Sequence, residues 1–370
     1  MHRPGRLPAM LRLTALLAGF MLAVTACAPA AAPPPPTSAP AKPAEAAKPA
    51  ADPTKPAVPV ASPSASPSPS PSPSPAAAAV PATSAPAASG AATGPIRMAF
   101  VPSSDSAKVL ASGKPLGDML SKELGSPVEV TVPTSYAAVI EAMGANQIDV
   151  AWLAPFAYVL AHQKFGSEVI LSSVRGGSKT YRSQIIVPAD SPVTDVKDLR
   201  GKKFAFVDAA SASGFLYPSA LLKDNGIDPK KDLGETLTAG GHDKVVIAVY
   251  NKQVDAGATF GDSAETGPPT DARTLVASTL PDVMDKVKVL AKTDPIPNDT
   301  VSVRKGLAPD TVARVRAGLL KIAQTPEGKK ALTDLYRIDG LAEAGDRDYD
   351  GLRRIAQLVG FDFEEQFKPK

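Results

Sequence analysis

The side chains best suited to bind a ligand lie in a turn between a short apolar strand and a helix. This turn contains Ser211 and Ser213; it follows the apolar run 203–207 and precedes the apolar run 215–222. We expect Ser213 to cap the helix and Gly214 to let the backbone approach a ligand. Free N–H groups at a helix N-terminus, together with serine hydroxyls, bind a small oxyanion without a formal positive charge. The turn alone leaves an ordinary capped loop equally open.

Three more ligand-competent side chains lie at the starts of predicted elements. Tyr136 follows Thr134-Ser135 at the start of a helix, and His242 follows two glycines at the start of another. Tyr181 begins the strand predicted at 182–187. Taken singly, each is more simply a packing or surface residue. Their common position at element starts favours a shared site, because ligands of α/β proteins bind where strands end and helices begin.

Residue sets for catalysis or metal binding are not found in the sequence. The three histidines, His2, His162 and His242, are too few and too scattered for a zinc site or a Ser-His-Asp triad. The segment 176–180, Gly-Gly-Ser-Lys-Thr, lacks the spacing of a phosphate-binding P-loop. We therefore expect a binding protein that is not an enzyme and uses no cofactor or metal.

The first residues resemble a bacterial lipoprotein signal. Three arginines precede the apolar run 13–23, which is too short to span a bilayer as a mature helix. Small residues at 24–26 directly precede Cys27, the single cysteine of the chain. We expect a signal peptide at 1–26 and a lipid on Cys27. The alternative is a plain signal peptide with an incidental cysteine.

Residues 27–94 are rich in alanine, proline and serine and predict a disordered tether. Alternating Ser-Pro at 66–75 favours an extended polyproline conformation. The full chain carries a net charge of +3, and the predicted signal peptide holds three arginines and no acidic residue. The mature chain is therefore neutral, which gives no support for nucleic-acid binding.

Strand-like and helix-like segments alternate through the remaining residues. The expected strands are 96–101, 128–132, 149–153, 169–174, 182–187, 203–207, 256–260, 287–291 and 300–304. The expected helices, besides the one opened by Ser213, are 108–124, 136–145, 242–252, 309–324, 327–336 and 349–359. Such alternation predicts an α/β architecture with mostly parallel sheets.

Residues 96–362 resemble the substrate-binding proteins of phosphate, phosphite and phosphonate ABC transporters, most closely the periplasmic phosphonate-binding proteins. The stretches that carry the resemblance are 136–143, 149–155, Tyr181 with 185–187, 208–218, His242 with 246–256, 294–299 and 336–340. The resemblance implies a two-lobed, type II periplasmic-binding-protein fold with two crossovers. One lobe would comprise 95–182 plus 298–370, and the other 183–297.

The resemblance also implies a ligand site in the cleft between the lobes. The positions that bind phosphonate oxygens in the family correspond to Tyr136, Tyr181, Ser211, Ser213 and His242. Ala212 stands where many relatives have a hydroxyl; its N–H remains, so we expect one hydrogen bond fewer, worth about 0.5–1.5 kcal/mol. Asp262 and Asp299 correspond to carboxylates that hold the ammonium of aminoalkylphosphonates. Alternatively, Asp262 caps a turn or forms a salt bridge.

The expected protein is a lipid-anchored, monomeric solute-binding protein of an ABC importer. It would bind a phosphorus oxyanion and deliver it to a permease and ATPase complex. Its place would be outside the cytoplasm, on the outer face of the cytoplasmic membrane, and periplasmic where an outer membrane exists. The alternative is a ligand-sensing module of the same fold in a signalling system.

Overall fold

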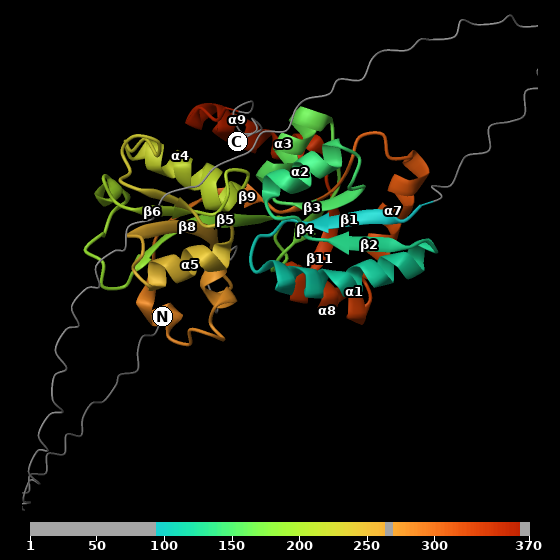
Figure 1. Cartoon of the computed structure of the whole chain (residues 1–370), viewed down its shortest axis with the longest axis horizontal. Helices are drawn as coiled ribbons and strands as arrows, with labels where there is room; N and C mark the ends of the chain where they lie inside the picture. Colours follow the sequence, from blue (N-terminus) through green and yellow to red (C-terminus); the bar gives the residue numbers. More distant parts are fainter. Residues whose placement is uncertain (1–93, 263–268, 363–370) are drawn as a thin grey trace, which may run out of the picture. The chain divides into compact units, whose positions relative to one another are not determined.

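The computed structural model describes residues 94–262 and 269–362 (Figure 1). Internal contacts divide the chain into two units, Met1–Ala82 and Thr83–Lys370, and every described residue belongs to the second. The predicted signal peptide, Cys27 and nearly all of the predicted tether lie outside the described residues. In the described ranges, the helices are all too short or too polar to cross a bilayer.

One mixed sheet has six strands in the order β11-β4-β10-β3-β1-β2. Its strands are β1 (Ile96–Phe100), β2 (Val128–Thr131), β3 (Val150–Leu153), β4 (Glu168–Val174), β10 (Thr300–Val303) and β11 (Gly340–Glu343). The helices on one face are α1 (Ser106–Leu124), α7 (Pro309–Ile322) and α8 (Pro326–Tyr336). Those on the other face are α2 (Tyr136–Gly144) and α3 (Pro155–Phe165), as Figure 1 shows.

A second mixed sheet has five strands in the order β7-β6-β8-β5-β9. Its strands are β5 (Thr180–Pro188), β6 (Phe204–Phe206), β7 (Thr236–Thr238), β8 (Ala256–Gly261) and β9 (Val287–Pro297). One face is covered by α4 (Tyr217–Asp224), and the other by α5 (His242–Tyr250) and α6 (Val283–Lys286). The remaining helical segments are η1 (Val196–Leu199), η2 (Ala212–Leu216), η3 (Ala272–Leu275), η4 (Asp346–Tyr349) and α9 (Asp350–Val359).

The chain passes between the two sheets twice, at residues 175–179 and at residues 298–299. The two connections are bonded to each other. Arg175 Nη1 donates to Asn298 Oδ1 at 3.2 Å, and Asn298 Nδ2 donates to the Ser178 carbonyl at 2.9 Å. The two crossovers are therefore joined by hydrogen bonds of polar side chains.

The prediction of mostly parallel sheets is wrong. In the described strands, β1 pairs with β2 and β3 in parallel, as β6 does with β7 and β8, but the other pairings are antiparallel. The crossovers explain this result. The chain leaves the first sheet at β4 and returns at β10, so these neighbours run in opposite directions. It enters the second sheet at β5 and leaves at β9, with the same consequence.

The segment after α9 contacts the elements of both sheets. The ring of Phe361 lies 4.9 Å from that of Phe156 in α3 and 6.2 Å from that of Phe215 in η2, measured between centroids. Close by, Lys223 Nζ at the end of α4 donates to the Val359 carbonyl at 2.7 Å. The C-terminal helix thus connects the helical layer of the first sheet with the serine-containing turn of the second.

Candidate functional site

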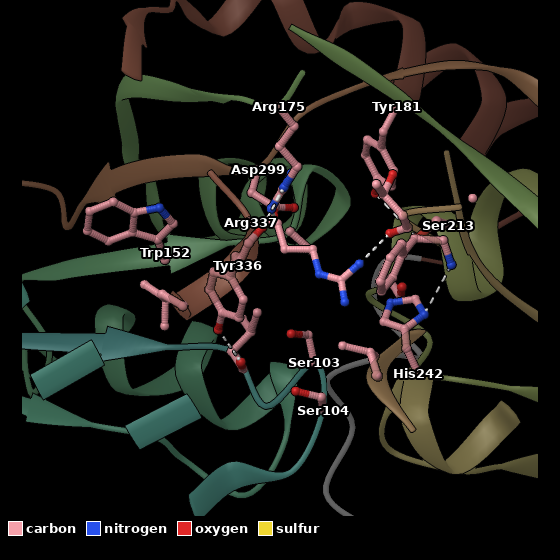
Figure 2. A pocket seen from close by; sticks show the side chains of 18 of the residues that line it. Ser103, Ser104, Trp152, Arg175, Tyr181, Ser213, His242, Asp299, Tyr336 and Arg337 are labelled. Atoms are coloured by element: carbon pink, nitrogen blue, oxygen red, sulfur yellow. Dashed lines mark hydrogen bonds and ion pairs between the residues drawn. The ribbon is translucent and has the colours of Figure 1, made fainter. Parts of the chain in front are cut away.

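A cavity of about 650 Å³ is lined by loops and helix ends from both sheets (Figure 2). This volume falls within the roughly 300–1,000 Å³ typical of pockets that bury organic ligands. Hydrogen bonds cross between the two sets of loops. His242 N–H donates to the Ser103 carbonyl at 2.9 Å, and Arg337 Nη1 donates to the Thr270 carbonyl at 2.8 Å. The cavity is therefore bridged by the protein's own hydrogen bonds.

Several helix N-termini meet at this cavity. Tyr136 is the first residue of α2, Ala154 precedes α3, Ser211 caps η2, and His242 is the first residue of α5. Each helix start presents N–H groups and the positive end of a helix dipole. Their convergence makes this part of the wall favourable for binding an anion, even though the wall there carries no formal positive charge.

Ser211, rather than Ser213, caps the helical turn. Ser211 Oγ accepts a hydrogen bond from Gly214 N–H at 3.0 Å, and its carbonyl accepts one from Leu216 N–H at 3.1 Å. The second bond spans five residues, so η2 begins as a π-helical turn. The predicted cap at Ser213 is wrong, and its Oγ instead accepts a long hydrogen bond from the Tyr181 hydroxyl at 3.4 Å. Both serines line the cavity.

Gly214 serves the packing of the turn. A Cβ atom at this position would lie 2.4 Å from Cβ and Cγ2 of Val207. Gly214 is not among the residues that line the cavity, and its expected role of admitting a ligand to the backbone stays a prediction. The glycine lets the turn approach the residue that follows β6.

The side chain of Ala212 belongs to the protein interior. Ala212 is fully buried in an apolar cluster with Leu216 and Phe156 and does not line the cavity. The N–H groups of Ala212 and Ser213 stand in the first turn, where a helix offers them no acceptor. The methyl group packs against apolar neighbours, and the backbone N–H is the one donor that this residue has.

His242 is a neutral donor on the cavity wall. Its Nδ1 accepts from the Phe260 N–H at 3.3 Å and lies 2.9 Å from Thr259 Oγ1. Because a backbone N–H can only donate, Nδ1 carries no proton, and the ring proton is on Nε2. Burial lowers the pKa of His242 to about 3, so the ring stays uncharged near neutral pH.

Two tyrosines complete the wall near the helix starts. Burial, and after it the negative charge of Asp208, raises the pKa of Tyr136 well above its ordinary value. Burial and then the charge of Asp299 raise the pKa of Tyr181. Both hydroxyls therefore remain protonated and can donate to an anion.

The two aspartates predicted to hold an ammonium have partners within the protein. Asp299 Oδ2 accepts from Arg175 Nη2 at 2.5 Å, and both side chains are about one-fifth exposed. Asp262 Oδ1 accepts from the N–H and the hydroxyl of Thr270, at 2.5 and 2.7 Å. Both aspartates line the cavity. Asp262 is thus bonded to Thr270, and the charge of Asp299 is balanced by Arg175. Their expected roles toward an ammonium group stay predictions.

Further lining residues were given no site role from the sequence: Ser103, Ser104, Trp152, Arg175, Lys292, Tyr336 and Arg337. Ser103 and Ser104 follow β1 and precede α1, so the strand-to-helix pattern used for the other serines could have found them. Arg337 lies in one of the stretches that carry the family resemblance. Its backbone φ of +55°, in the left-handed region that favours glycine, has no sequence signal.

Trp152 is among the residues that line the cavity, and its indole N–H is buried and unpaired in the described part of the chain. The residue is fully buried against Phe100, with ring centroids 5.4 Å apart. In the described part of the chain, no group of three His, Cys, Asp or Glu side chains could hold a metal ion.

A family profile and similar proteins of known name indicate the family of this chain. The sequence profile described as "ABC transporter, phosphonate, periplasmic substrate-binding protein" matches residues 98–349. The phosphate-import protein PhnD of Mycolicibacterium smegmatis is 31% identical over 287 residues, covering 72% of this chain and 86% of its own. The phosphonates-binding periplasmic protein of Escherichia coli is 29% identical over 221 residues, 58% of this chain and 62% of its own.

A solved structure shares the fold. The binding protein component of an ABC phosphonate transporter from Pseudomonas aeruginosa superposes with a TM-score of 0.65 at 24% identity, covering 72% of this chain and 87% of the other. The α/β fold with two lobes that the sequence predicted is thereby confirmed for the described residues.

Proposed function

Because this chain belongs to the family of periplasmic substrate-binding proteins of phosphonate ABC transporters, we propose that its cavity binds a phosphorus oxyanion for import. The family consists of solute-binding transport proteins, and we propose the same role here, without enzymatic activity. The observation that carries the proposal is the convergence of helix N-termini with protonated hydroxyls and a neutral histidine. These groups donate hydrogen bonds to an anion without titrating near neutral pH.

The oxyanion would be held by Tyr136, Tyr181, Ser211, Ser213, His242 and the N–H of Ala212. The donors come from α2, β5, η2 and α5, which belong to different sheets. A ligand bound to all of them would therefore join the two lobes. We propose two lobes that meet at the crossovers 175–179 and 298–299. The boundary expected from the sequence between 182 and 183 falls inside β5, whose residues 180–182 pair within the second sheet, so we place it before Thr180. One relative is named for phosphate and another for phosphonates, so both belong in the first ligand screen.

The test is calorimetric titration of the purified full-length chain with phosphate, phosphite, methylphosphonate and 2-aminoethylphosphonate. At least one should bind, and Tyr136→Phe should weaken that ligand about ten- to hundredfold, since a hydrogen bond to a charged group contributes about 1.5–3 kcal/mol. Tyr250→Phe is the matched control, because its hydroxyl donates to Asp282 outside the cavity wall. Absence of binding by all four ligands would refute the proposed function.

The proposed setting is extracytoplasmic, with the chain anchored by a lipid on Cys27 and linked to the membrane by residues 27–94. The protein would act as a monomer that delivers its ligand to a permease and ATPase complex. Small residues before the single cysteine support the anchor. In cells, Cys27→Ser should move the protein from the membrane fraction to the soluble fraction, and an unchanged distribution would contradict the lipid anchor.

A further inference from the structure

The wall of the cavity formed by the end of α8 differs chemically from the wall formed by helix starts. Tyr336 ends α8 and Arg337 follows it, and both line the cavity. The carbonyl end of a helix carries a partial negative charge, which repels an anion. An anionic group can bind on this side only if a full positive charge offsets that end of the helix.

Arg337 supplies such a charge. Figure 2 shows its guanidinium projecting between Tyr336 and His242. Its one hydrogen bond within the described ranges uses Nη1, which donates to the Thr270 carbonyl at 2.8 Å. The carboxylates of Asp271 and Asp262 act on its charge electrostatically, but neither forms a direct ion pair with it in the described ranges. The guanidinium has five N–H donors in a planar fork that matches a carboxylate. Apart from the bond of Nη1 to Thr270, these donors have no hydrogen-bond acceptor in the described part of the chain, and Arg337 lines the cavity.

The backbone at Arg337 supports a role for its side chain. Its φ of +55° places it in the left-handed conformation at the C-cap of α8, where glycine is the favoured residue. A long charged residue at such a position costs conformational free energy that glycine would avoid. Packing offsets little of this cost, because Arg337 is an exposed residue.

The acidic residues of the same cavity are already paired or bonded. Asp299 pairs with Arg175 at 2.5 Å, and Asp334 with Lys330 at 2.6 Å. Asp262 accepts two hydrogen bonds from Thr270. An ammonium group on the ligand would have to compete with these partners and would also meet Arg337.

The space beyond the oxyanion donors is large. A cavity of about 650 Å³ far exceeds a five-atom oxyanion, given that one water molecule takes up about 30 Å³. The indole N–H of Trp152 has no partner among the described residues, but it is buried and offers no donor to a ligand in the cavity. A second anionic group therefore has room, and the guanidinium of Arg337 supplies its donors.

We propose that Arg337 binds a carboxylate on the substituent of the ligand, so that the protein selects phosphonates with a carboxylate over aminoalkylphosphonates. This proposal rests on the proposed function, since the phosphorus end must occupy the donors at the helix starts. Arg337 is then a specificity-determining residue of that site. The cation and the helix starts hold opposite ends of one ligand.

The experiment compares calorimetric affinities of the full-length chain for phosphonoacetate and 3-phosphonopropionate with those for methylphosphonate and 2-aminoethylphosphonate. The better of the two carboxylate ligands should bind about ten- to hundredfold more tightly than methylphosphonate, the range expected for a hydrogen bond to a charged group. Arg337→Gly and Arg337→Gln should remove that advantage and change the affinity for methylphosphonate less than about threefold.

Lys252→Gly is the matched control. Lys252 is another basic residue with a left-handed backbone, φ +54°, and it lies outside the cavity wall. The Lys252→Gly substitution should leave the affinities for the carboxylate ligand and for methylphosphonate unchanged. Thermal unfolding of Arg337→Gly should occur at no lower temperature than for the wild type, which separates ligand selection from folding.

Different failures have different meanings. If methylphosphonate binds but the carboxylate gives no gain, or if the Arg337 variants weaken all ligands by one common factor, the proposal for Arg337 is wrong and the proposed function stands. If none of these ligands, nor phosphate or phosphite, binds the wild type, the proposed function fails and this inference fails with it.

Discussion

His242 shows how one buried side chain can serve an anion site without a charge. Its Nδ1 is held as an acceptor by the Phe260 N–H, which fixes the proton on Nε2. Burial lowers its pKa to about 3. A neutral ring binds an anion less strongly than a charged one, but it does not change state over the physiological pH range.

The buried histidine predicts a pH dependence of stability. The unfolded chain protonates His242 near pH 6.5, whereas the folded chain does so only near pH 3. Between these values the unfolded state binds one more proton than the folded state. The free energy of unfolding is therefore unaffected by His242 above about pH 6.5 and decreases as the pH falls below that value. The slope is about 1.4 kcal/mol per pH unit.

Urea unfolding at pH 7, 6 and 5 measures this slope. His242→Asn should unfold with a flatter dependence than the wild type between pH 6.5 and 5. His162→Asn is the control, because His162 contacts the Ser167 carbonyl at the end of α3, away from the cavity. Equal slopes in the wild type and His242→Asn would show that another group is responsible.

At the residue scale, the sequence located the lining side chains but not their partners within the protein. Seven of the eight ligand positions taken from the sequence line the cavity, and their binding roles stay predictions. The pairing of Arg175 with Asp299 could not be predicted, because it joins residues 124 positions apart at two different crossovers. The contact of Arg337 with Thr270 spans 67 positions and depends on the same tertiary arrangement.

At the level of elements, the turn η2 is the feature that the local sequence predicted least well. The sequence predicted an ordinary helix capped at Ser213, whereas the structure has a π-helical turn capped at Ser211. The strand β9 is a second example, predicted at 287–291 and observed to Pro297. The added part contains Pro295 and Pro297, which are tolerated because β9 is an edge strand, where a missing N–H leaves no ladder bond unmade.

The close contact of η2 with Val207 predicts that Gly214→Ala destabilises the protein. The added methyl would lie 2.4 Å from the Val207 side chain, and overpacking of this kind costs about 1–3 kcal/mol. Relief of the clash would shift the turn that carries Ser213, so ligand affinity should fall as well. Chemical denaturation and the calorimetric titration measure the two effects.

Gly351→Ala provides the matched control. Gly351 lies near the start of α9, where an added methyl would meet only Arg354 Nη2 at 3.9 Å. Alanine in a helix should leave stability unchanged or raise it by up to about 1 kcal/mol. A Gly214→Ala protein as stable as Gly351→Ala would mean that the turn adapts without strain.

On the scale of the whole described structure, the two sheets share contacts beyond the crossovers. The alternation of segments was sufficient to predict an α/β protein, and the family resemblance to predict two lobes. The antiparallel strands at the crossovers were not predictable from either strand alone, because strand direction follows from where the chain leaves and re-enters each sheet. The bridging role of Phe361 likewise depends on long-range packing.

The position of Phe361 predicts an effect on both stability and binding. Phe361→Ala removes ring contacts with Phe156 in one lobe and Phe215 in the other. Because Phe361 is half-buried, the substitution should lower the free energy of unfolding by about 1–3 kcal/mol, which is less than the usual cost for a fully buried phenylalanine. Because Phe215 belongs to the turn of Ser211 and Ser213, ligand affinity should also fall.

Leu358→Ala is the control from the same helix, since Leu358 is 63% exposed. Its free energy of unfolding should lie within about 0.5 kcal/mol of the wild type. Equal losses in the two variants would contradict a specific role of the aromatic bridge.

The single tryptophan of the chain has an experimental consequence. Trp152 lies in the cavity wall, stacked on Phe100 with its N–H unpaired among the described residues. All indole fluorescence of the protein therefore originates at the proposed binding site. A ligand that changes the polarity around this ring should shift its emission, so occupancy can be followed optically without a label.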